Sequence, residues 1–238
     1  MAVRDPVGAY SPHDSMSRIA LAAAFLGHDF RQELVLAEAL THRSAAGAKG
    51  VGSNERLEFI GDRVLGLVIA EWLIERFPDE QEGKLGPRLA ALVSKPALAG
   101  IAETHNVAAM LSVAPGEAKR GVSMQANVLA DAIEAMIGAL YLDGGLDAAR
   151  QFIRRIFAQA VQGQSAPPKD PKTALQEWAL KRALPLPLYE IVDRSGPSHA
   201  PQFVVRVSVG EVNATASAGA KRAAEQEAAR NLLGTLPQ

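Results

Sequence analysis

The sequence predicts an all-α domain over residues 15–162, followed by a small α+β domain of order α-β-β-β-α over residues 170–238. Apolar residues recur at helical spacing before residue 165, and no strand-like alternation stands out there. The run from 162 to 170, Gln-Gly-Gln-Ser-Ala-Pro-Pro-Lys-Asp, has the composition of a linker, which we place at residues 163–169. Beyond it, three β-rich stretches lie between two helical ones.

Residues 1–14 are expected to form a loose arm, and residues 45–53 and 114–121 to form loops. Glycine and proline breaks divide the first domain into predicted helices at 15–26, 31–40, 54–77, 85–93, 97–103, 127–138 and 146–161. In the second domain, Asp170 or Thr173 can cap the first helix. The predicted elements there are a helix at 172–183, strands at 188–193, 203–209 and 212–217, and a helix at 221–233.

The composition excludes several classes of function. The chain has 238 residues, 48% of them hydrophobic, which is enough for a substantial core. Its net charge of −1 gives no global signal of nucleic-acid binding, although local patches can still bind. Cysteine is absent, which excludes disulfides, thiolate catalysis and cysteine zinc sites. No signal peptide and no bilayer-spanning apolar run is found, so we expect a cytoplasmic protein without a membrane partner.

The predicted helix that starts at Ser53 or Asn54 carries acidic residues beside its apolar stripe. Glu58 and Asp62 are four residues apart, so they lie one turn apart on the same side, and Glu55 lies near them. Carboxylates stacked in this way repel each other. A cation is therefore expected beside them, and a hard divalent metal ion is one candidate.

A second acidic pair, Asp131 and Glu134, lies on one face of the predicted helix over residues 127–138. Gly66 follows Asp62 by one turn, and Gly138 follows Glu134 by one turn. Small residues let two helix backbones approach closely. The sequence therefore predicts that the two helices cross at these glycines with four carboxylates facing each other.

Four carboxylates would form an oxygen-only site of the kind that Mg²⁺ and Mn²⁺ prefer. A metal ion held there can lower the pKa of water and neutralise charge on a phosphoryl group, which suits phosphodiester hydrolysis. The alternative is that the acids form structural ion pairs with Arg56, Arg63 or Lys119. Spacing alone favours neither interpretation.

The run from Asn54 to Asp62, Asn-Glu-Arg-Leu-Glu-Phe-Ile-Gly-Asp, resembles the signature of the ribonuclease III family, endonucleases of double-stranded RNA. Three other stretches resemble further blocks of that family in the same order: Leu-Thr-His-Arg-Ser at 40–44, Gly-Glu at 116–117 and Leu-Ala-Asp-Ala-Ile-Glu-Ala at 129–135. Residues 170–233 resemble the family's double-stranded-RNA-binding domain. The resemblance implies a catalytic domain at 15–162 and an RNA-binding domain at 170–238.

The resemblance also implies roles for individual acids. Glu58, Asp62, Asp131 and Glu134 match the family's magnesium-binding acids, with Mn²⁺ expected to substitute, and Asp62 and Glu134 match the catalytic two. Glu55 matches a supporting acid. The implied reaction is magnesium-dependent cleavage of both RNA strands by a homodimer without an organic cofactor. The implied products carry 5′-phosphates and two-nucleotide 3′ overhangs, and the implied substrates are ribosomal, messenger and transfer RNA precursors.

Phe59 bears on the expected homodimer. It lies about 200° from Leu57 on the helical wheel, off the apolar stripe. A large aromatic side chain on a second helix face indicates another surface to bury. That surface is either a neighbouring helix of the same subunit or the subunit interface, and the resemblance favours the interface.

Double-stranded RNA is recognised through 2′-hydroxyls, phosphates and groove spacing. The second domain offers Gln176 and Glu177 on its first helix, His199 in the loop after the first strand, and Lys221 and Arg222 at the start of its last helix. The family usually has a Gly-rich turn with a Ser before this basic pair, and a third basic residue. This chain has alanine at those Gly, Ser and third basic positions. We therefore expect weaker RNA binding by this domain than in more basic relatives.

Two other functions fit parts of the sequence. One is a double-stranded-RNA-binding regulator that has lost cleavage, and the presence of all four acids argues against it. The other is a magnesium-dependent nucleotide pyrophosphohydrolase built from the helical domain, and the second domain argues against it.

Overall fold

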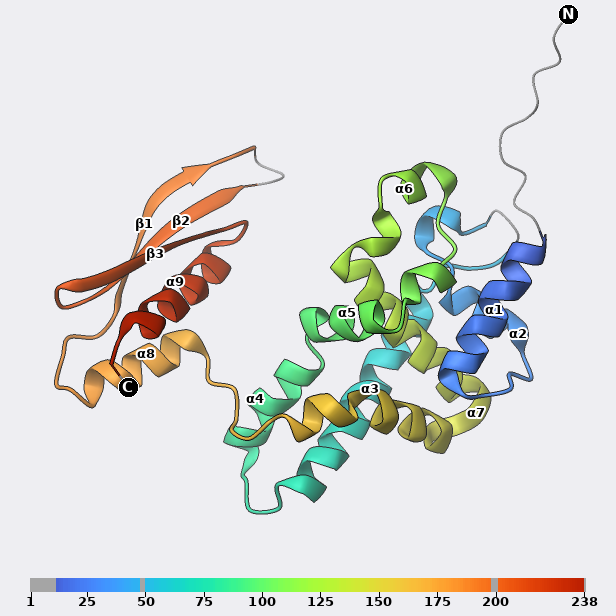
Figure 1. The fold of residues 1–238 in the computed structure, drawn as a ribbon, viewed down its shortest axis with the longest axis horizontal. Coiled ribbons are helices and arrows are strands. Elements are labelled where there is room, and N and C mark those ends of the chain that lie inside the picture. Colours follow the sequence, from blue (N-terminus) through green and yellow to red (C-terminus); the bar gives the residue numbers. More distant parts are fainter. Residues whose placement is uncertain (1–11, 48–49, 198–200, 238) are drawn as a thin grey trace, which may run out of the picture. The chain divides into compact units, whose positions relative to one another are not determined.

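The computed structural model describes residues 12–47, 50–197 and 201–237 (Figure 1). The chain separates into two compact units, with the boundary between Pro167 and Pro168. Each unit is described by itself. The first is helical and the second combines helices with one antiparallel sheet, so the predicted fold class is confirmed.

The first unit consists of α-helices joined by short 3₁₀ turns. Its α-helices are α1 (Pro12–Leu26), α2 (Glu33–Ala39), α3 (Glu55–Arg76), α4 (Glu82–Leu92), α5 (Lys95–Thr104), α6 (Pro115–Lys119) and α7 (Ala126–Gln162). The 3₁₀ turns are η1 (Arg43–Ala45), η2 (Val107–Met110) and η3 (Val122–Met124). A single parallel bridge, between Thr41 and Ser112, is the only β-type pairing in the described part of this unit.

One prediction about the helices was wrong in detail. Residues 114–121 were expected to be a loop, but they contain α6. Pro115 occupies the first turn of this helix, where its missing N–H costs nothing, and Gly121 follows the helix with a φ of 72°. The helices expected at 127–138 and 146–161 are both present within α7, where they meet at a kink at the non-helical Gly145, with φ of 78° and ψ of −177°, so the predicted break is confirmed.

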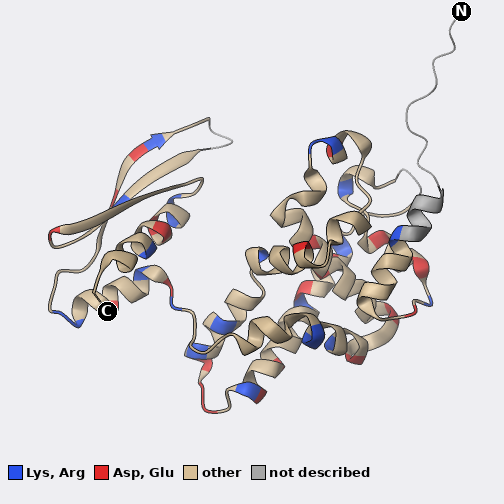
Figure 2. Cartoon of the chain, viewed as in Figure 1, with Lys and Arg blue, Asp and Glu red and all other residues tan. Residues whose placement is uncertain are grey.

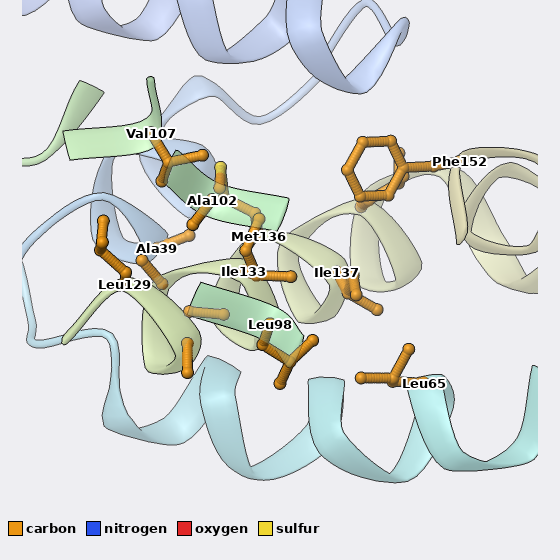
Figure 3. Close-up of a cluster of buried hydrophobic side chains, with 14 of the residues drawn as sticks. Ala39, Leu65, Leu98, Ala102, Val107, Leu129, Ile133, Met136, Ile137 and Phe152 are labelled. Carbon is orange, nitrogen blue, oxygen red and sulfur yellow. The ribbon is translucent and has the colours of Figure 1, made fainter. Parts of the chain in front are cut away.

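The core of the first unit surrounds the first half of α7. Helices α2, α3 and α5 all pack against α7, so its apolar residues are buried around most of its circumference (Figure 3). Leu65 of α3 and Leu98 of α5 meet Ile133 and Ile137 of α7 in this cluster. Each fully buried aliphatic side chain contributes about 1.5–3 kcal/mol of hydrophobic stabilisation. This packing fixes α3 and α7 relative to each other.

Two glycines allow α3 and α7 to come into backbone contact. A Cβ atom on Gly61 would lie 1.8 Å from the carbonyl oxygen of Glu134, and one on Gly138 would lie 2.2 Å from the carbonyl oxygen of Leu57. Gly66 has no neighbouring atom within 4 Å of such a position. The predicted close crossing is therefore present, but the assignment to Gly66 was wrong, because Gly61 supplies the contact on α3.

The second unit contains α8 (Pro171–Leu180), β1 (Leu188–Ser195), β2 (Gln202–Val209), β3 (Val212–Ala218) and α9 (Lys221–Thr235). The strands form an antiparallel sheet of order β1-β2-β3. Helix α9 packs against β2, β3 and α8, and buries Leu175, Val207 and Leu232 in a small core. The Asp170 side chain accepts hydrogen bonds from the N–H groups of Lys172 and Thr173, so the predicted Asp170 cap is confirmed.

Charged residues of both signs are interspersed along the helices of both units, in line with the net charge of −1 (Figure 2). None of the helices in the described ranges combines the length and apolar character that a membrane span requires.

Candidate active site

The crossing of α3 and α7 gathers three carboxylates. Glu58 of α3 and Asp131 and Glu134 of α7 each offer one oxygen, and these oxygens lie within 4.8 Å of one another. Glu58 precedes Gly61 by less than one turn, and Glu134 supplies the carbonyl oxygen that Gly61 faces. The close backbone contact therefore brings these acids together. Three oxygen donors at this spacing fit a hard divalent cation.

Asp62 is placed differently from the other three predicted metal-binding acids. Its carboxylate accepts a hydrogen bond from Arg63 Nη1 at 2.9 Å, and its side chain is 49% exposed. The ion-pair alternative from the sequence therefore describes Asp62 in this structure. Asp62 nevertheless lies near enough to Glu134 to act on it electrostatically. An exposed pair of this kind is worth only about 0–1 kcal/mol, so it can separate readily.

The cluster carries more negative charge than its surroundings neutralise. Burial, followed by the negative charges of Asp62, Glu58 and Asp131, raises the pKa of Glu134 to about 7. Burial and the charge of Asp131 also raise the pKa of Glu58, while Lys95 acts in the opposite direction. Glu134 is only 7% exposed. A buried carboxylate among other carboxylates indicates a place where a cation would be stabilised.

We expect the metal-free protein to lose stability as pH rises from about 5 to 8 because of Glu134. The folded state holds this proton up to a pKa of about 7, whereas the unfolded chain releases it near 4.5. Stability therefore falls as pH rises through this window, by roughly 2–3 kcal/mol. Urea unfolding in EDTA should show the fall, and Glu134→Gln should remove most of it. The same pH dependence of the free energy of unfolding in the wild type and in Glu134→Gln would contradict this prediction.

Glu55 and His42 lie beside the cluster. A pocket of about 120 Å³ is lined by His42, Arg43, Asn54, Glu55, Glu58, Asn127, Val128 and Asp131. Glu55 is exposed in the first turn of α3 and accepts a hydrogen bond from Ser53 Oγ at 2.7 Å. Asn54 precedes α3, but its side chain accepts no capping hydrogen bond from the helix. The Ser53 hydroxyl donates to the Glu55 carboxylate instead, so neither predicted cap forms.

His42 and Lys95 also lie at the cluster, although no role was predicted for either residue from the sequence. Burial, and then the neighbouring charge of Arg43, lower the pKa of His42. Lys95 Nζ donates a hydrogen bond to Asp131 Oδ1 at 2.9 Å, and this bond raises the pKa of Lys95. Both residues come from segments distant in sequence from Asp131, so no local spacing could have linked them to the cluster.

In the second unit, several predicted RNA-contact residues share one surface. A shallow pocket of about 830 Å³ is lined by Asp170, Lys172, Thr173, Gln176, Lys221, Arg222, Glu225 and Gln226. Gln176, Lys221 and Arg222 therefore lie together, with Lys172 as a basic residue that the sequence analysis missed. Glu177 is not among the lining residues and pairs with Lys169 at 2.6 Å. His199 lies outside the described residues.

Comparison with known proteins identifies the family. A family model described as Ribonuclease-III-like matches residues 32–160, and one described as Double-stranded RNA binding motif matches residues 171–236. A protein of Jannaschia sp. (strain CCS1) named Ribonuclease 3 is 47% identical over 213 residues, which cover 89% of this chain and 93% of the relative. The chain belongs to the ribonuclease III family.

A second Ribonuclease 3, from Caulobacter vibrioides (strain NA1000 / CB15N), is 47% identical to this ribonuclease III family member over 214 residues, 87% of this chain and 91% of the relative. A solved nuclease domain of ribonuclease III from Campylobacter jejuni is 35% identical with a TM-score of 0.56, covering 59% of this chain and 96% of that domain. The protein is a double-stranded-RNA-specific endoribonuclease. Family membership thus favours the nuclease over both alternatives.

Proposed function

We propose that this ribonuclease III family member is a Mg²⁺-dependent enzyme that leaves 5′-phosphate ends and two-nucleotide 3′ overhangs. The observation that carries the proposal is the cluster of Glu58, Asp131 and Glu134, which is oxygen-only and short of positive charge. A divalent ion bound there would activate water and neutralise charge on the phosphate, and Mn²⁺ suits the same donors. We assign catalysis to Asp62 and Glu134, with Asp62 joining the site after leaving Arg63, and a supporting role to Glu55.

Cleavage of a defined RNA hairpin tests this proposal. Products should accept ligation that requires a 5′-phosphate, and sequencing of both strands should give staggered cuts with two-nucleotide 3′ overhangs. EDTA should stop the reaction, and either Mg²⁺ or Mn²⁺ should restore it. Cleavage in EDTA, or products ending in 3′-phosphates, would refute the metal-dependent mechanism.

We also propose that residues 15–162 cleave, residues 163–169 connect, and residues 170–238 bind the RNA duplex. Gln176, Glu177 and His199 are assigned to the grooves and Lys221 and Arg222 to phosphates. In support, α9 starts at Lys221 and its first N–H groups have no side-chain cap, so the helix dipole and both cations favour an anion there. Glu225 Oε1 lies 3.8 Å from Lys221 Nζ and reduces the net positive charge at the start of α9. This agrees with the expected weak binding of RNA by this domain.

Reversing the charges of Lys221 and Arg222 together, as Lys221→Glu with Arg222→Glu, should weaken duplex binding about ten-fold or more, with a smaller salt dependence. Binding of a long duplex at several salt concentrations measures both quantities. Lys181→Glu is the control, because Lys181 is exposed at the opposite end of α8. Equal losses of duplex affinity in the control and the double variant would contradict the assignment of Lys221 and Arg222 to phosphate binding.

We propose that the protein acts as a homodimer with Phe59 in the interface. Phe59 is 63% exposed, so it does not pack under a helix of its own unit. Leu67 and Ile74 are also exposed and lie within about 80° of it on α3, and the Arg63 guanidinium stacks on its ring at 4.1 Å. The Campylobacter jejuni domain is described as flexible in a region involved in dimer formation. An exposed apolar strip of this kind supports a second copy as its partner.

Phe59→Glu should shift the protein toward the monomer, because a charge would be buried in the proposed interface. Sedimentation at several concentrations measures the change. Leu34→Glu is the matched control, because Leu34 is a large apolar residue that is 75% exposed and belongs to α2, not to α3. A dimer that resists Phe59→Glu would place the interface elsewhere.

For the cell, we propose a cytoplasmic role in processing ribosomal, messenger and transfer RNA precursors. Membership of a double-stranded-RNA endoribonuclease family supports this role, because folded precursors supply RNA duplexes. Depletion of the protein should lead to accumulation of unprocessed ribosomal precursors with intact duplex stems, and normal precursor levels would contradict the role.

A further inference from the structure

Lys95 brings a positive charge into the acid cluster. Its Nζ donates a hydrogen bond to Asp131 Oδ1 at 2.9 Å, and its side chain is 60% exposed whereas that of Asp131 is 25% exposed. Lys95 is the first residue of α5, whose start is fixed by the Ser94 side chain, which accepts a hydrogen bond from the Ala97 N–H. The backbone at Lys95 is therefore held in place, and its long side chain extends to Asp131 on α7.

Lys95 is also the cation that acts on the other two acids. Its charge acts on both Glu58 and Glu134 and partly offsets the repulsion between the acids. Arg63 is engaged with Asp62 instead. The Lys95 ammonium thus supplies positive charge beside these carboxylates, as a bound metal ion would.

We propose that Lys95 is a built-in counter-ion that holds Asp131 in the metal-free protein and that a divalent ion must displace from Asp131. This inference rests on the metal site of the proposed function. An ammonium group and a divalent ion cannot both lie against Asp131 without strong repulsion. Because the Lys95 side chain is flexible and largely exposed, it can leave into solvent at little cost. Lys95 therefore keeps the empty cluster stable and lowers the affinity for the metal ion.

Lys95→Met tests the proposal, because methionine keeps most of the length and removes the charge. In the full-length protein without RNA, calorimetric titration with Mg²⁺ should give binding tighter by about ten-fold or more, the effect of removing a nearby positive charge. In EDTA, the melting temperature should fall below that of the wild type, and added Mg²⁺ should raise it by more than in the wild type. Lys95→Arg, which keeps the charge, should behave much like the wild type.

Lys84→Met is the matched control, since Lys84 is exposed on α4 and its loss changes the net charge equally. Unchanged or weaker Mg²⁺ binding by Lys95→Met would overturn the counter-ion role while leaving the metal site in place. Equal effects of Lys95→Met and Lys84→Met would also overturn it, because they would show a general charge effect. Absence of Mg²⁺ binding in the wild type would instead refute the proposed function, and the counter-ion role with it.

Discussion

Replacing Glu134 with glutamine is expected to lower the cleavage rate of double-stranded RNA by at least about a thousand-fold. Glu134 is buried in the acid cluster and is the acid whose pKa is raised to about 7. An amide of the same shape carries no charge, so it cannot offset a divalent ion. Rates should be measured in single-turnover reactions with excess enzyme, so that binding does not limit them.

Duplex binding by the Glu134→Gln protein should stay nearly unchanged, because the side chain lies at the helix crossing and the proposed RNA-binding residues lie in the other unit. Glu103→Gln, an exposed change of the same type on α5, is the control and should cut normally. The variant should also be more stable than the wild type in EDTA above pH 7. Cleavage at the wild-type rate, or loss of duplex binding with an intact fold, would refute the assigned role.

Replacing Gly61 with alanine is expected to destabilise the first unit by on the order of 4 kcal/mol. The new Cβ atom would lie 1.8 Å from the Glu134 carbonyl oxygen, and the obstacle is helix backbone, which no side-chain rotation can move. The two helices must separate or the unit must unfold. Urea unfolding of the full-length protein, followed by helical circular dichroism, measures the loss.

Gly100→Ala on α5 is the control, because Gly66 lies about 20° from Phe59 on α3 and so on the proposed dimer face. A Cβ atom at Gly100 would meet nothing within 4 Å, so alanine there should stabilise the protein by roughly 0.5–1 kcal/mol through its better helix propensity. The two glycines therefore should respond with opposite signs. A similar response at both positions would show that the α3–α7 contact is not tight at Gly61.

The sequence could predict the elements whose signal is local. The helical periodicity of apolar residues predicts α3, and β-rich alternation predicts the strands of the second unit. Asp170 caps α8, as expected of an aspartate that precedes a helix. Helix α6 was missed because five residues are too few to show a helical period. The two helices within α7 were predictable because Gly144 and Gly145 interrupt the helical pattern, and the backbone of Gly145 is indeed non-helical.

Side-chain partners across the fold were harder to predict than elements. Spacing placed Glu58, Asp131 and Glu134 on suitable helix faces, and their carboxylate oxygens indicated a hard metal ion. Family resemblance then favoured the metal site over structural ion pairs. The choice of Gly61 over Gly66 depends on where the helices cross, which the spacing along either helix does not define. Lys95 reaches Asp131 from another helix, so its partner depends on the packing of α5 against α7.

The contact between Gly61 and the Glu134 carbonyl limits how this nuclease could be altered by directed evolution. One peptide group serves both the packing of the fold and the placement of an acid of the proposed active site, so the two properties cannot be varied separately at this position. Random substitutions along the seam between α3 and α7 should mostly yield proteins that fail to fold. Variants with a changed preference for the proposed metal ion should be sought at the margin of the cluster, where the Lys95 side chain is 60% exposed and His42 lines the pocket beside Glu58 and Asp131.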